Sequence, residues 1–133
     1  LADKSALARA HVAAVAVRLK PLFLGGEVAS CGIVDLEMLF SARSTTDYLA
    51  ILADRHSLPR VEVGGAGIER AIEVQTALAR KGHHRGVIIP DLLIAATAET
   101  AELCVLHYDH DFELIAEVTG QPVEWVVPQG SIS

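Results

Sequence analysis

The stretch Ile88-Ile89-Pro90-Asp91-Leu92-Leu93-Ile94-Ala95-Ala96-Thr97-Ala98 decides the fold. Pro90 has no N–H to donate and its φ suits a first helical turn, so a helix is predicted to start there. Asp91 lies in that first turn, where exposed amides and the helix dipole favour a carboxylate. The residues that follow are apolar or small, which predicts a buried helix. Asp91 is therefore either a favourable first-turn charge or an acid held at the tip of a buried helix.

Helical and extended segments alternate on both sides of this stretch. Helical spacing and end signals predict helices over 6–19, 32–43, 45–56, 68–81 and 111–118, and extended segments at 1–3, 28–31, 60–63, 103–106 and 123–127. Such alternation predicts a parallel sheet covered on both faces, in an α/β fold. We expect one domain over residues 1–133, with a few native residues preceding Leu1.

The composition limits the functional classes. Hydrophobic residues make up 51% of the 133 residues and aromatic residues only 5%, which predicts a compact aliphatic globule. No apolar run reaches the roughly 18 residues that cross a bilayer, and no leader is apparent, so a cytoplasmic location without membrane contact is expected. The two thiols, Cys31 and Cys104, are expected to be reduced. A net charge of −6 disfavours a broad electrostatic grip on nucleic acid but permits a nuclease whose acids are neutralised by bound cations.

Three acids are predicted to meet at one edge of the sheet. Asp3 and Asp109 lie at the carboxyl ends of predicted strands, and Asp91 opens a helix. Ligands of such sheets bind beyond the carboxyl ends of the strands, where helices also begin. Asp3, Asp91 and Asp109 are therefore expected to converge.

Glu37 is the fourth candidate acid. On a helical wheel it falls inside the apolar arc of the 32–43 helix, whereas Asp35 turns towards water. An ionised Glu on a core-facing stripe is costly unless it is paired or binds a metal. The alternative is a buried salt bridge from Glu37 to Arg9 or Arg85.

Asp111 follows Asp109 by two positions and is either a fifth carboxylate of the site or the N-cap of the next helix. Carboxylates gathered at one point repel each other unless a cation lies among them. Hard oxygen ligands select Mg²⁺ or Mn²⁺. Such ions activate water for phosphodiester hydrolysis, which is the chemistry that this set of acids predicts.

Four segments, in order and spacing, resemble the motifs of PIN-domain ribonucleases, and more narrowly of the VapC toxins of bacterial VapBC toxin–antitoxin pairs. They are Asp3-Lys4-Ser5-Ala6-Leu7, the helix that carries Glu37, the segment 90–96, and Leu106-His107-Tyr108-Asp109-His110-Asp111-Phe112. The resemblance covers essentially the whole chain. It implies a three-layer α/β/α domain with a short central parallel sheet.

The resemblance also implies roles for individual residues. Asp3, Glu37, Asp91 and Asp109 would be the catalytic, metal-binding acids, with Asp111 as an auxiliary ligand. Ser5 matches the small hydroxyl residue that supports the first Asp by hydrogen bonding. His107 stands where the family commonly has Thr or Ser, so a neutral imidazole would have to replace the usual hydroxyl contact.

For the whole protein, the resemblance implies an endoribonuclease that uses Mg²⁺ or Mn²⁺ and cuts RNA. It also implies a homodimer inhibited by a cognate VapB antitoxin that docks near the acidic site. The RNA and the bond that is cut do not follow from the sequence.

Other interpretations of the same residues remain open at this stage. The acids would also suit a Mg²⁺-binding receiver domain that accepts a phosphoryl group on Asp, although no Lys follows the strand at 103–106. A catalytically silent module that binds a basic peptide needs no metal at all. A Zn²⁺ or Fe²⁺ site would have to use His107 and His110, without a third His or Cys to complete it. A basic rim for RNA would draw on scattered cations, namely Lys4, Arg9, Lys20, Arg43 and Arg85.

Overall fold

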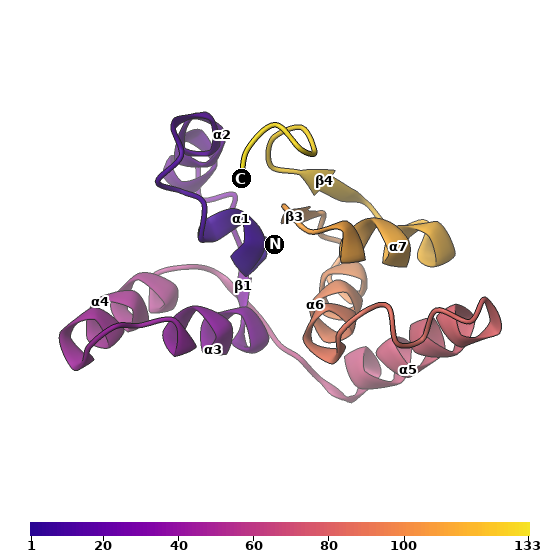
Figure 1. Ribbon diagram of the computed structural model, residues 1–133. Coiled ribbons are helices and arrows are strands. Elements are labelled where there is room, and N and C mark those ends of the chain that lie inside the picture. Colours follow the sequence, from indigo (N-terminus) through magenta and orange to yellow (C-terminus); the bar gives the residue numbers. More distant parts are fainter.

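The computed structural model describes residues 1–133, and helices alternate with short strands along the chain (Figure 1). In order, the elements are α1 (Lys4–Leu7), α2 (Ala13–Leu24), β1 (Ser30–Cys31), α3 (Gly32–Phe40), α4 (Thr45–His56), β2 (Arg60–Val61), α5 (Gly65–Arg80), α6 (Ile89–Thr100), β3 (Val105–His107), α7 (His110–Thr119) and β4 (Val123–Trp125). The predicted α/β class is therefore confirmed. No helix combines the length and apolar character that crossing a bilayer would require.

The strands pair in parallel, as predicted, but they form two separate two-stranded sheets instead of one central sheet. β1 pairs with β2, and β3 pairs with β4, both in parallel register. The N-terminal segment joins the second pair through a parallel bridge between Ala2 and Leu106. Asp3 therefore leaves this sheet at the same end at which β3 runs into Asp109.

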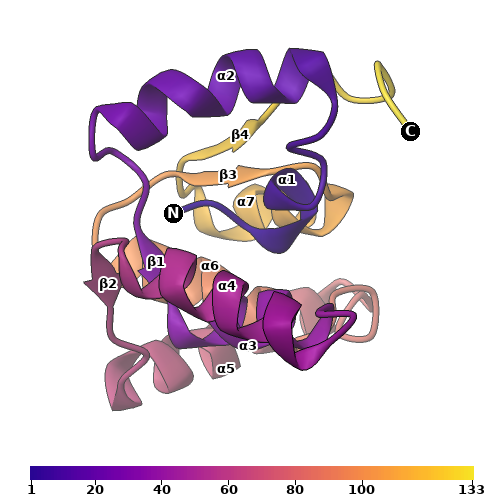
Figure 2. The same cartoon turned by 90° about the vertical axis from the view of Figure 1, so that its left-hand side faces the viewer.

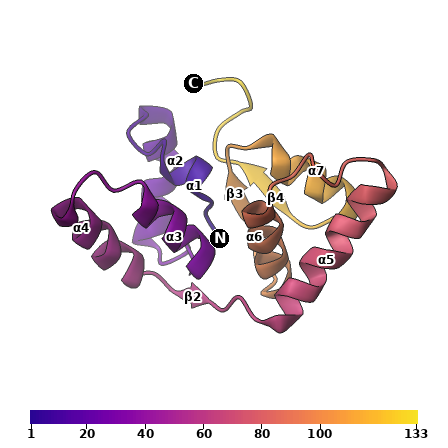
Figure 3. The ribbon, with the colours of Figure 1, turned by 60° about the horizontal axis from the view of Figure 1, so that its bottom comes forward.

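The helices cover the strands on opposite sides. Figure 2 shows β3 and β4 between α2 on one side and α7 on the other. Figure 3 shows α3 and α4 on one flank and α5 and α6 on the other, with β2 in the segment that joins them. The N-terminus lies between these flanks in Figure 3, and α1 packs against β3 and α3.

The deciding stretch forms the buried helix that its sequence predicts. α6 starts at Ile89 with Pro90 in its first turn, one residue earlier than expected. Every residue of α6 from Asp91 to Ala98 except Leu93 is buried. Ile94 packs in a core that also contains Phe112 and Ile115 of α7. This packing fixes the N-terminal end of α6, and with it Asp91.

The predicted continuous helix over 6–19 is wrong. α1 ends at Leu7, and α2 begins at Ala13 and continues through Pro21 to Leu24. Pro21 removes only the hydrogen bond to the Val17 carbonyl. Val17 is 75% exposed, so that carbonyl lies on the solvent side, where water can replace the lost donor.

The helical-wheel argument for α3 is also wrong in part. Asp35, expected in water, is only 5% exposed, while the aromatic Phe40 at the end of the same helix is 89% exposed. The Arg55 Nε atom lies 2.7 Å from Asp35 Oδ1, and the Arg60 Nη2 atom lies 2.6 Å from Asp35 Oδ2. Burial raises the pKa of Asp35, but the hydrogen bonds from Ser30 and Arg55 and the Arg55 charge outweigh it and lower that pKa overall. The charges of Arg55 on α4 and Arg60 on β2 thus offset the free-energy cost of burying the Asp35 carboxylate.

Replacing Arg60 with Gln is expected to lower the free energy of unfolding by about 1 kcal/mol, because its side chain is half-exposed and Asp35 keeps Arg55. Urea denaturation measures this change. Arg80→Gln, at the exposed end of α5, removes the same charge without an ion pair. Equal stability of the two variants would contradict a stabilising role for the Arg60–Asp35 pair.

Candidate active site

Asp3 ends the N-terminal extended segment and caps α1. Its N–H donates to the Leu106 carbonyl at 2.9 Å, which ties it to β3. The Oδ2 atom of Asp3 accepts hydrogen bonds from the Ser5 amide at 2.9 Å and from the Ser5 hydroxyl at 2.6 Å. Its other oxygen, Oδ1, is buried and has no hydrogen-bond partner. Ser5 thus holds Asp3 in place, while one carboxylate oxygen stays free for another ligand.

Asp91 lies in the first turn of α6 and is only 3% exposed. Its Oδ2 atom is also buried without a hydrogen-bond partner. Burial, a hydrogen bond with Asp111 and the charges of Asp3, Asp109 and Asp111 together raise the pKa of Asp91 to about 9. Asp91 is therefore more than a favourable first-turn charge, because in this cluster it holds a proton at neutral pH unless a cation is present.

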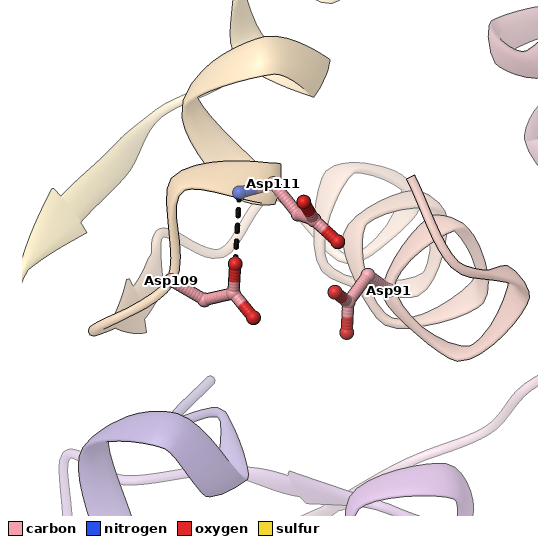
Figure 4. A group of neighbouring side chains, drawn as sticks. All are labelled: Asp91, Asp109 and Asp111. Atoms are coloured by element: carbon pink, nitrogen blue, oxygen red, sulfur yellow. Dashed lines mark hydrogen bonds between the residues drawn. The ribbon is translucent and has the colours of Figure 1, made fainter. Parts of the chain in front are cut away.

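Asp109 is the N-cap of α7: its Oδ1 atom accepts a hydrogen bond from the Asp111 amide at 2.9 Å (Figure 4). The alternative in which Asp111 caps this helix is therefore wrong. Asp111 lies in the first turn of α7 instead, and its carboxylate turns towards Asp91 in Figure 4. One oxygen from each of Asp91, Asp109 and Asp111 lies within 4.8 Å of the others.

Glu37 joins the site from α3. It lines a cavity of about 250 Å³ together with Asp3, Asp91 and Asp109. Partial burial raises the pKa of Glu37, the negative charges of Asp3 and Asp109 raise it further, and the Lys4 ammonium acts in the opposite direction. The expected alternative, a buried salt bridge from Glu37 to Arg9 or Arg85, is absent; the buried ion pair of α3 belongs to Asp35.

The structure thus brings all five candidate acids into two overlapping groups. The cavity contains Asp3, Glu37, Asp91 and Asp109, and the tight cluster contains Asp91, Asp109 and Asp111. Two buried carboxylate oxygens without partners, on Asp3 and Asp91, would be destabilising unless a proton or a cation satisfied them. Because all donors are carboxylate oxygens, the set fits a hard divalent cation.

His107 is fully buried and accepts a hydrogen bond from the backbone of Asp109, one of the candidate acids. Its Nδ1 atom accepts a hydrogen bond from the Asp109 amide at 3.1 Å, so we assign the ring hydrogen to Nε2, which lies 3.1 Å from the Glu113 carboxylate. Burial lowers the pKa of His107, which favours this neutral form. With both ring nitrogens engaged, and with His110 exposed, these imidazoles do not form the Zn²⁺ or Fe²⁺ site considered above.

Some of these features had no signal in the sequence. Glu113 was not expected to contact His107, although the spacing of six residues across the start of a helix allows it. Trp125 packs on the His107 ring, with 4.8 Å between the ring centroids. Of the proposed basic rim, only Lys4 and Arg9 line the acidic cavity, and Arg43 lines a neighbouring hollow with Lys4.

Comparison with known proteins assigns the class that this fold and site define. The PIN domain family model matches residues 2–118. Ribonuclease VapC21 of Mycobacterium tuberculosis is 52% identical over 132 residues, which cover 98% of this chain and 96% of the relative. Ribonuclease VapC18 of the same species is 42% identical, with the same coverage of both chains. The chain therefore belongs to the PIN-domain family and, within it, to the VapC group.

Solved structures agree on the fold. The structure of VapBC2 from Rickettsia felis bound to a promoter DNA fragment aligns with a TM-score of 0.71 at 20% identity, covering 93% of this chain and 96% of that one. The DNA-bound VapBC structure from Salmonella typhimurium aligns with a TM-score of 0.74 at 18% identity, covering 95% and 96%. At these identities the likeness supports the PIN-type α/β architecture alone, and the family assignment disfavours the receiver-domain alternative.

Proposed function

We propose that this protein is a Mg²⁺- or Mn²⁺-dependent endoribonuclease that acts as the toxin of a VapBC-type pair. The observation that carries the proposal is the convergence of Asp3, Glu37, Asp91 and Asp109 on one cavity. Similarity to proteins named as ribonucleases supports the reaction class. RNA is the proposed substrate.

The proposed ligands of the cation are Asp3, Glu37, Asp91 and Asp109, with Asp111 as an auxiliary carboxylate. When bound, a divalent ion supplies an activated water and neutralises charge on the phosphate and on the leaving oxygen. The chain's own residues prepare the site. Ser5 fixes Asp3 through two hydrogen bonds, and the first turn of α7 fixes Asp109. Asp91, whose raised pKa keeps it protonated at neutral pH, would release that proton to serve as a ligand.

The test is cleavage of a single-stranded RNA in the presence of Mg²⁺ or Mn²⁺ and in the presence of EDTA. Cleavage is expected with either metal and none with EDTA, and readdition of the metal should restore it. Cleavage that continues in EDTA would disprove a metal-dependent mechanism, because the acids alone repel the phosphate.

His107→Leu is expected to slow cleavage about tenfold, because the Asp109 amide loses its hydrogen-bond acceptor. His107→Asn retains a side-chain acceptor and should lose less activity. Initial cleavage rates measure both, and Trp125→Phe is the control, since it alters the same aromatic cluster without touching that hydrogen bond. Equal losses in all three variants would mean that packing alone matters.

The proposed antitoxin partner would bind exposed apolar side chains of α3 and α4. Leu36 and Phe40 of α3 are 66% and 89% exposed, and Leu49 of α4 is 57% exposed. Exposed apolar side chains in such number mark an interaction surface. Because Glu37 lies on the same helix, a VapB-like chain bound there would lie beside the acidic cavity.

A homodimer is the proposed assembly, formed through α5 and the start of α6. Ile68, Ile72 and Ile89 are exposed and line an apolar hollow of about 310 Å³. Ile72→Lys is expected to convert the dimer to a monomer, because two charges would face each other across a two-fold interface. Light scattering measures the mass. A monomeric parent protein, or a variant that stays dimeric, would contradict this interface.

A further inference from the structure

Arg9 is the one arginine that lines the acidic cavity, and no Asp or Glu side chain pairs with it. Arg18, Arg55, Arg60 and Arg70 each form an ion pair within 4.0 Å, whereas Arg9 forms none. Lys4 also lines the cavity, but its charge acts on Glu37. Arg9 therefore brings positive charge to a cavity of acids without being neutralised by any of them.

Two backbone oxygens and an aromatic ring hold the Arg9 guanidinium in place. Its Nη1 atom donates to the Ser5 carbonyl at 2.7 Å, and its Nε atom donates to the Ser133 backbone oxygen at 3.1 Å. The guanidinium carbon lies 4.8 Å from the centre of the Tyr108 ring, a cation–π contact. Tyr108 is itself fixed, since its amide donates to the Ser5 hydroxyl at 2.9 Å and its own hydroxyl donates to the Ile132 carbonyl at 2.8 Å.

These contacts leave donors unused. A guanidinium carries several N–H groups in a planar fork, and the two hydrogen bonds of Arg9 occupy only Nε and one N–H of Nη1. The remaining N–H groups have no acceptor in the protein. A fixed guanidinium with free donors matches the geometry of phosphate oxygens, which it can bind by two parallel hydrogen bonds.

Ser5 connects this cation to the acids. Its hydroxyl donates to Asp3 and its carbonyl accepts from Arg9, so a single residue positions an anion and a cation of the same cavity. An RNA strand must bring a phosphate to carboxylates that repel it. A preset positive charge beside them lowers that repulsion for the substrate without occupying an acid.

We propose that Arg9 binds a phosphate group of the RNA strand beside the acidic cavity and thereby holds the substrate for cleavage. This inference rests on the proposed ribonuclease function. In a purely structural role, Arg9 would only fasten the C-terminal segment to α1 and Tyr108.

The test compares Arg9→Gln, Arg9→Lys and the control Arg80→Gln, which removes a charge from the exposed end of α5. KM and kcat are measured on a short single-stranded RNA with Mn²⁺. RNA binding is measured in EDTA at several salt concentrations, with each change placed in an Asp91→Asn background that does not cleave. Urea denaturation reports the stability of every variant.

Arg9→Gln is expected to raise KM about tenfold with a smaller change in kcat, and Arg9→Lys should lie between it and the parent. The slope of log binding constant against log salt should fall by about 0.7 in Arg9→Gln, as for one lost phosphate contact on a single strand. A KM and a salt slope equal to those of Arg80→Gln would overturn the proposal, whatever the change in stability. If the parent protein neither binds nor cleaves RNA, both this inference and the proposed function are wrong. If the parent protein cleaves RNA and Arg9→Gln has the same KM and salt slope as the parent, only this inference is wrong.

Discussion

Asp91→Asn is expected to lower the rate of RNA cleavage by about a thousandfold or more, because the cation loses a buried ligand and with it several kcal/mol of transition-state stabilisation. Asp91 occupies the centre of the site, since it belongs both to the cavity with Asp3 and Glu37 and to the cluster with Asp109 and Asp111. The amide keeps the shape of the side chain, so the fold of α6 should persist.

The measurement is the initial rate of RNA cleavage at saturating Mn²⁺, with Asp54→Asn as the matched control. Asp54 lies on the exposed face of α4, so the same chemical change there should leave the rate unaltered. Residual activity of Asp91→Asn within tenfold of the parent would show that the buried acid of α6 is not part of the reaction.

The same substitution is expected to stabilise the metal-free protein by several kcal/mol at pH 8. The pKa of Asp91 is raised in the folded state to about 9, so the folded chain binds a proton more tightly than the unfolded chain does. Between the ordinary Asp pKa and that raised value, the folded protein retains a proton that the unfolded chain has released. Its stability therefore falls as pH rises, and an uncharged Asn removes this penalty.

Urea denaturation in EDTA from pH 4 to pH 8 measures the effect. The advantage of Asp91→Asn over the parent should be small at pH 4 and should grow steadily towards pH 8, while Asp54→Asn follows the parent throughout. An Asp91→Asn variant less stable than the parent at pH 8, or a stability difference that does not change with pH, would contradict a raised pKa of Asp91 in the folded protein. Loss of activity together with gained stability is the pattern expected of a ligand for a cation.

The sequence was sufficient for the centre of the site because local rules place those residues. Pro90 sets the start of α6, and its apolar continuation makes that helix buried, so Asp91 has a fixed place at its tip. Asp3 and Asp109 follow parallel extended segments that end at one edge of the sheet. Convergence of these three acids therefore follows from topology and needs no knowledge of side-chain packing.

The rest depended on contacts between distant elements. The burial of Asp35 could not be predicted from α3 alone, because the charges that stabilise the buried carboxylate belong to Arg55 on α4 and Arg60 on β2. The helical wheel placed Glu37 inside the apolar arc, and Glu37 does line the acidic cavity, yet the wheel turned the buried Asp35 towards water.

His107 and Arg9 illustrate the same limit at the site itself. No spacing pattern in the sequence predicts the hydrogen bond from the Asp109 amide to His107 or the one from Arg9 to the Ser5 carbonyl. Each of these bonds is local, spanning two and four residues, but they meet in one region only because the turn after β3 lies beside the start of α1, as the hydrogen bond from the Tyr108 amide to the Ser5 hydroxyl shows. Supporting residues of this kind become visible only when the fold is known.

The central claim is that the acids converge in order to hold a divalent cation, and calorimetric titration with Mn²⁺ at pH 7 tests it most directly. We predict saturable binding accompanied by release of a proton from Asp91, detected as a heat that varies with the ionisation enthalpy of the buffer. Asp3→Asn should weaken the binding strongly, and Asp54→Asn should leave it unchanged. Absence of Mn²⁺ binding, or binding that survives Asp3→Asn unaltered and releases no proton, would contradict the account.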